Sequence, residues 1–179
     1  MWEERDEAIK QKYETLNNEN IEKFSSDKDI RFGCKGKSKH WIGYKRHTSV
    51  DCQSGLTNRS SVSMANVADC DGFESVCPDS GGIYADKGYD CEKNAETASS
   101  RGAHLRAIKK NTRKDKNFDL DHYLSQIRCP YERVFSKLPH RTRFRGLTKN
   151  NFANLMEVIA FNIKRLKVII FDEKWVSVG

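Results

Sequence analysis

The sequence predicts an α/β fold, in which a small sheet is covered by helices. Residues 83–85, Ile-Tyr-Ala, form a short apolar run that ends at Asp86, and such a run is typical of a strand buried on both faces. Residues 41–51 and 56–62 are rich in aromatic and β-branched side chains, which predicts a β-hairpin. Residues 119–138 carry apolar side chains at helical spacing and predict a long helix.

Length and charge limit the possible functions. A chain of 179 residues with 37% hydrophobic residues fits one compact domain. Residues 1–100 hold 14 Lys and Arg against 18 Asp and Glu, a net charge of −4, whereas residues 101–179 hold 18 against 7, a net charge of +11. Positive charge concentrated in one half of a chain indicates a polyanionic partner, most commonly nucleic acid.

The cysteine pattern argues against a structural zinc site. The six cysteines, at positions 34, 52, 70, 77, 91 and 129, form no Cys-x-x-Cys pair, which is the spacing that zinc sites favour. The N-terminal residues do not resemble a signal peptide, and no apolar run is as long as a membrane span. These features predict a cytoplasmic protein with free thiols.

The N-terminal half is expected to contain a helix, a basic loop and the hairpin. Residues 2–24 have weakly amphipathic helical spacing, and residues 31–39 combine four basic residues with glycines. The hairpin places Asp51 at the end of its first strand, where the residue is either a functional carboxylate or a turn former. A brief helix follows, with Asn66 or Asp69 as its cap.

The central stretch is organised around Asp86. A carboxylate at the carboxyl end of a buried strand lies where α/β sheets usually open their ligand site; a helix cap or turn former is the alternative interpretation of Asp86. The composition of residues 91–100 predicts a helix, and residues 104–108 resemble another strand.

The C-terminal half contains the best helical signal and most of the basic residues. In the helix predicted over 119–138, Asp119 is expected to be the N-cap and Pro130 to cause a kink or a restart. Glu132 borders the apolar stripe and is either functional or simply favoured by the helix dipole. A last amphipathic helix is expected through Phe152, Leu155, Met156, Ile159, Ile163 and Leu166.

Five segments together resemble the catalytic domain of DDE transposases from bacterial insertion sequences. They occur in the order of that family, and the resemblance covers about residues 27–167. The segments are residues 41–51, 64–69, 85–90, 131–135 and 141–150. The resemblance implies an RNase H-like mixed sheet flanked by helices over residues 27–168, with a helical remnant at 1–26 and a tail at 169–179.

The resemblance also implies a catalytic triad of Asp51, Asp86 and Glu132 that binds Mg²⁺ or Mn²⁺. Cleaving and rejoining a phosphodiester is served by two divalent ions about 3.5–4 Å apart, and carboxylate oxygens are the hard ligands that such ions prefer. The implied partner is DNA, at transposon ends and target, with association to the nucleoid and self-association in a transposition complex. The expected DNA contacts are Arg141, Arg143, Arg145, Lys149, Lys109 and Lys110.

Several departures from the family pattern predict an N-terminally truncated copy. The family carries a helical DNA-recognition region ahead of the catalytic domain, whereas here one charged helix is expected. Ser136 stands where the family usually has glycine, and only 35 residues separate Asp51 from Asp86. The alternative to an active transposase is therefore a catalytically silent relic that binds DNA non-specifically.

Overall fold

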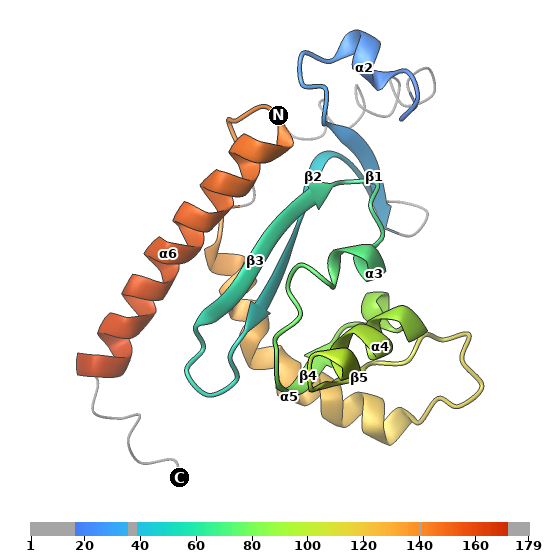
Figure 1. The fold of residues 1–179 in the computed structure, drawn as a ribbon, viewed down its shortest axis with the longest axis vertical. Helices are drawn as coiled ribbons and strands as arrows, with labels where there is room; N and C mark the ends of the chain where they lie inside the picture. Colours follow the sequence, from blue (N-terminus) through green and yellow to red (C-terminus); the bar gives the residue numbers. More distant parts are fainter. Residues whose placement is uncertain (1–16, 36–38, 140, 172–179) are drawn as a thin grey trace.

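The computed structural model describes residues 17–35, 39–139 and 141–171, and it confirms the α/β class (Figure 1). In chain order the elements are α2 (Ile21–Phe24), β1 (Arg31–Lys35), β2 (Lys39–Val50), β3 (Thr57–Met64), α3 (Asp69–Gly72), β4 (Gly81–Ala85), the 3-10 helix η1 (Lys87–Tyr89), α4 (Glu92–Ser100), β5 (Ala103–Ala107), α5 (Phe118–Lys137) and α6 (Leu147–Phe171). Of the helix expected over residues 2–24, residues 2–16 lie outside the described part, and α2 covers only its end.

The predicted hairpin is confirmed as β2 and β3 of a three-stranded antiparallel sheet in the order β1-β2-β3. The first part of β2 pairs with β1, where Gly43 lies opposite Arg31, and the second part pairs with β3, where Tyr44 lies opposite Met64. An irregularity between Ser49 and Val50 shifts the register just before the turn. The turn is closed by the backbone N–H of Asp51, which donates to the carbonyl of Leu56 at 2.8 Å.

A separate two-stranded parallel sheet is formed by β4 and β5. The helix α4 connects them, and a small core of Phe73, Cys77, Ala98 and Ala103 lies beneath, which confirms the predicted strand–helix–strand order. Two expectations differ from the structure. In the described part of the chain the strands form two sheets instead of one mixed sheet, and β4 is not buried on both faces, because only Ala85 of its residues is buried.

The helix α6 packs along β3 with a polar face (Figure 1). The side-chain amide of Asn162 accepts from the backbone N–H of Thr57 and donates to its carbonyl, both at 2.9 Å, and Asn151 accepts from the N–H of Val62 at 3.2 Å. These amides cover the edge of β3, which is a common way to protect an edge strand. The amphipathic helix expected in this region is confirmed as α6, and it meets β3 with asparagines because the edge of β3 is polar.

Helix boundaries differ from the sequence-based expectation at three positions. Asn117 is the N-cap of α5 in place of Asp119, and its side chain accepts from the N–H of Leu120 at 3.1 Å. The helix continues through Pro130 without a restart. The cap of α3 is Ala68, so neither of the two predicted caps is correct. Predicted caps fail here because several Asx residues compete near each helix start, and the tertiary fold selects among them.

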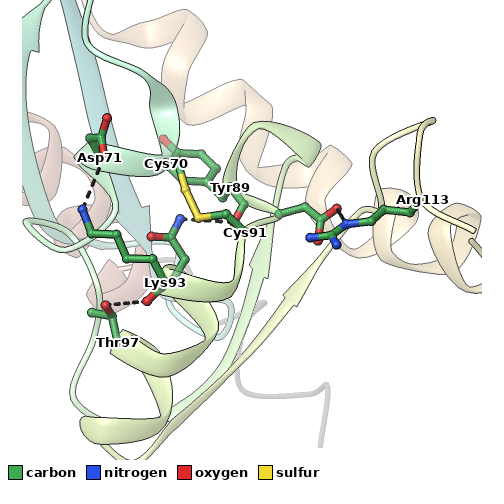
Figure 2. The surroundings of a disulfide bond; sticks show 9 residues. Cys70, Asp71, Tyr89, Cys91, Lys93, Thr97 and Arg113 are labelled. Atoms are coloured by element: carbon green, nitrogen blue, oxygen red, sulfur yellow. Dashed lines mark hydrogen bonds and ion pairs between the residues drawn. A yellow bond between two sulfur atoms is a disulfide. The ribbon is translucent and has the colours of Figure 1, made fainter. Parts of the chain in front are cut away.

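Cys70 and Cys91 form a disulfide that joins the start of α3 to the N-cap of α4 (Figure 2). The expectation that all cysteines are free thiols is wrong for this pair. It holds for the other four, at positions 34, 52, 77 and 129. The two partners are 21 residues apart, and their proximity arises from the return of the chain after β4, which cysteine spacing does not reveal. Among the described helices, none is long and apolar enough to cross a membrane.

Candidate active site

Asp86 lies at the carboxyl end of β4, where the chain turns into η1. Its Oδ1 accepts from the backbone N–H of Lys87 at 2.7 Å, so the residue also caps the 3-10 helix. The side chain is 45% exposed, and its Oδ1 is 3.9 Å from Nη1 of Arg128 on α5. The cap and the functional interpretations of this carboxylate are thus compatible, since the capping residue is still partly exposed.

Glu132 is an exposed residue of α5, four positions after Arg128. Residues four apart lie on the same side of a helix, so Glu132 is carried on the side of α5 that reaches Asp86 through Arg128. On the same helix, the hydroxyl of Tyr131 donates to the backbone carbonyl of Cys52. One turn of α5 therefore contacts both the end of β4 and the turn that follows β2.

Asp51 is held in that turn by local hydrogen bonds. Its Oδ2 accepts from the backbone N–H of Ser54 at 2.7 Å and from the Ser54 hydroxyl at 2.6 Å. These bonds, the side-chain one first, lower the pKa of Asp51. The turn is fastened to α6 by Arg165, whose Nε donates to the carbonyl of Ser54 at 2.7 Å. Asp51 thus stabilises the turn in this structure.

The three carboxylates are not gathered into a metal-binding group. Within the described residues, no three His, Cys, Asp or Glu side chains are grouped so that they could hold a metal ion. Asp51 follows a strand of the antiparallel sheet, whereas Asp86 follows a strand of the parallel sheet. Carboxylate oxygens suit Mg²⁺ or Mn²⁺. The three carboxylates would have to move closer together around α5 before they could share an ion.

A buried histidine connects the antiparallel sheet to the 3-10 helix that follows Asp86. His47 of β2 is only 2% exposed; its Nδ1 is 3.0 Å from the hydroxyl of Tyr89, and its Nε2 is 2.9 Å from the hydroxyl of Ser63. Burial lowers the pKa of His47 and raises that of Tyr89 to about 12. The lowered pKa favours the neutral imidazole, which holds Tyr89, three residues after Asp86, against β2.

Sequence reasoning missed two charged residues near Asp86. Arg128 faces the carboxylate directly. Asp69 packs against the turn that follows, because a Cβ added to Gly88 would lie 2.8 Å from its Oδ2, and it pairs with Lys45 at 3.0 Å. Helical spacing from Glu132 could have drawn attention to Arg128. No local signal distinguishes Asp69 from an ordinary cap residue.

The predicted DNA-contacting residues fall into two groups. Arg141, Arg143, Arg145 and Lys149, which we call the basic cluster, are all exposed around the start of α6. Lys109 and Lys110 follow β5 on the opposite side of the molecule (Figure 1). There the Nζ of Lys109 is 3.3 Å from a carboxylate oxygen of Asp115, so its charge is partly satisfied within the protein.

A groove between the end of α5 and α6 adds positive charge near the Asp51 turn. Its volume is about 540 Å³, and its lining includes Lys137, Lys164 and Arg165. Arg165 links the groove to the turn through its bond to Ser54. The groove therefore adjoins the same turn that Tyr131 contacts at Cys52. Its positive charge suits phosphate groups.

Comparison with known families supplies the identification. The family model described as "Transposase DDE domain" matches residues 17–163. The chain belongs to this family. It is also 26% identical over 151 residues to the transposase for insertion sequence element IS1106 of Neisseria meningitidis serogroup B. The match covers 78% of this chain and 52% of that relative, so the chain spans about half the length of the transposase it matches. No solved structure matches the chain significantly.

Proposed function

We propose that residues 27–168 form a transposase catalytic domain of RNase H-like type, which cleaves and joins DNA strands at Asp51, Asp86 and Glu132. The observation that carries this proposal is the position of α5. Arg128 contacts Asp86 and Tyr131 contacts the Asp51 turn, so the helix that carries Glu132 reaches both aspartate-bearing strand ends. Membership of the transposase DDE family supports the same assignment.

The carboxylates would hold Mg²⁺ or Mn²⁺, which would activate the attacking oxygen and stabilise the leaving oxygen of the phosphodiester. Arg128 is placed to offset the repulsion between neighbouring carboxylates, because its guanidinium lies against Asp86. For Asp51 to join the other two, its carboxylate has to give up at least part of its hydrogen bonding to Ser54. Asp51 is accordingly the member of the triad that needs the most rearrangement.

DNA would be held mainly through its phosphates. The basic cluster is exposed, and the groove with Lys137 and Lys164 is linked to the Asp51 turn through Arg165. Contacts of this kind position the duplex without reading its sequence. Lys109 and Lys110 follow β5, on a different element from the basic cluster, and would contact a second DNA segment, such as the target.

A plasmid-nicking assay with Mn²⁺ tests this proposal. Asp86→Asn and Glu132→Gln should abolish conversion of supercoiled to open-circular DNA, while Glu96→Gln, an exposed Glu on α4, should leave it unchanged. Asp51→Asn and Asp69→Asn then show which second aspartate serves the reaction. Unchanged nicking by both Asp86→Asn and Glu132→Gln would refute the proposal.

The second candidate is a DNA-binding protein without strand-cleaving activity. The observation that favours it is the separation of the carboxylates, which form no metal-holding group within the described residues. This candidate predicts salt-dependent binding to DNA with no Mn²⁺-dependent nicking by the wild-type chain. The same assay therefore separates the two functions.

A further inference from the structure

The helix α6 presents an uninterrupted apolar stripe away from the rest of the protein. Six large apolar side chains lie in a single row, and they are between 41% and 67% exposed. The row consists of Phe152, Met156, Ile159, Ile163, Leu166 and Ile170. Monomeric proteins rarely expose contiguous apolar patches larger than a few hundred Å², and larger patches mark interaction sites.

The spacing of this row is that of a coiled coil. Successive members are four, three, four, three and four residues apart, which is the alternation of a and d positions in a heptad repeat. The a positions are Met156, Ile163 and Ile170, and the d positions are Phe152, Ile159 and Leu166. Two of the three a positions are isoleucine, and isoleucine at a together with leucine at d, as at Leu166, favours parallel two-stranded coils, whereas isoleucine at d, as at Ile159, favours higher oligomers.

The opposite face of α6 already packs against β3. Asn154 is 1% exposed and bonded to the hydroxyl of Ser60, and Val158 is 7% exposed. Asn162, which borders the row, holds both backbone groups of Thr57. Rotation of the helix to bury its apolar row would break these bonds and leave the amides unsatisfied. The row can therefore be covered only by something outside the described fold.

We propose that the occupant is α6 of a second copy of this chain, packed in parallel as a two-stranded coiled coil. With Leu155 and Phe171, eight large apolar side chains are exposed along the helix. At roughly 150–200 Å² for a large side chain, about half of it accessible, they offer on the order of 800 Å² per copy. A stable interface typically buries about that area on each partner.

The charges along the seam suit self-association. The positions that flank the a and d row are Ala153, Leu155, Ala160, Asn162, Lys167 and Ile169. Lys167 is the only charged member, and in a parallel register it lies opposite Asn162 of the other copy, so no like charges meet. The twofold arrangement is isologous and closed, which limits assembly to a dimer.

Sedimentation of the full chain at micromolar concentration tests this interface. The wild type is expected to be dimeric, and Ile163→Glu to be monomeric with unchanged circular dichroism. Val168→Glu is the matched control, because Val168 lies on the same helix, is 38% exposed and stands outside the a and d row; it should remain dimeric. Loss of the dimer in both variants would indicate nonspecific association and overturn the proposal.

Mixing two variants with opposite charges at residue 163 identifies the partner and the register. Ile163→Glu and Ile163→Lys chains should each be monomeric, and an equimolar mixture should recover a dimer, because in a parallel coil residue 163 of one copy meets residue 163 of the other. A mixture that stays monomeric, or a wild-type chain that is monomeric and binds lipid vesicles, would contradict the proposal. Since neither readout involves DNA cleavage, failure of the proposed function would leave this result intact.

Discussion

Replacing His47 by leucine tests how the segment that carries Asp86 is held against β2. The imidazole is 2% exposed and contacts the hydroxyls of Tyr89 and Ser63. Leucine leaves both hydroxyls without these partners, and an unsatisfied buried polar group costs about 1–3 kcal/mol. The Ser63 hydroxyl keeps a weak bond to the carbonyl of Met64 at 3.4 Å, so we expect a total loss of about 2–4 kcal/mol.

The effect of His47→Leu should depend on pH. Burial lowers the pKa of His47 below its ordinary value, and among the charged groups that face it Asp69 opposes this shift while Lys45 adds to it. A group whose folded-state pKa is lowered in this way binds its proton preferentially in the unfolded chain. The wild type therefore has the full contribution of neutral His47 above about pH 6.5 and loses it as the pH falls toward the folded-state pKa.

Urea unfolding at pH 7.5 and pH 5, followed by circular dichroism, measures both effects. The difference in unfolding free energy between the wild type and His47→Leu should be largest at pH 7.5 and smaller at pH 5. His104→Leu, an exposed histidine on β5, is the control and should change little at either pH. A difference that stays constant, or grows at pH 5, would refute the assignment of His47 as a buried neutral link.

Three further predictions concern other parts of the molecule. Cys70→Ser removes the bond to Cys91, which closes a loop of 21 residues, and should lower stability by roughly 3 kcal/mol in thermal unfolding; equal stability with and without reductant would argue against the bond. Asn162→Leu should cost about 2–4 kcal/mol, because both backbone groups of Thr57 lose their partner, and an unchanged urea midpoint would contradict the polar packing of α6. Replacing the three arginines of the basic cluster by glutamine should reduce the slope of log K against log salt by about 2–3 for duplex DNA; an unchanged slope in fluorescence anisotropy would place the DNA elsewhere.

Local patterns were sufficient to predict β2, β3, β4 and β5, but not β1, whose residues were expected to form a basic loop. The aromatic and β-branched residues before Asp51, and the glycines before Ile83, determine β2, β3 and β4 without reference to distant contacts. The same is true of α4 and β5, whose order follows from composition and turn residues. For these elements local propensity and the tertiary fold agree.

Features that depend on distant partners were not predictable in this way. The spacing of residues 152–166 predicted an amphipathic helix but not which face of α6 meets β3, where Asn154 and Asn162 bond to the polar edge of that strand. The bond between Cys70 and Cys91 depends on how the chain returns after β4. The triad of Asp51, Asp86 and Glu132 stays a prediction, since its geometry depends on how closely the two sheets approach around α5.

Binding of Mn²⁺, measured by electron paramagnetic resonance, tests the proposed carboxylate site most directly. The free-ion signal should fall when the wild-type chain is added together with a short DNA duplex, and Asp86→Asn and Glu132→Gln should each weaken this binding by about tenfold or more. Glu96→Gln should bind Mn²⁺ as the wild type does. Equal affinity in all four proteins would contradict the claim that α5 brings Glu132 to the metal ligands at the end of β4.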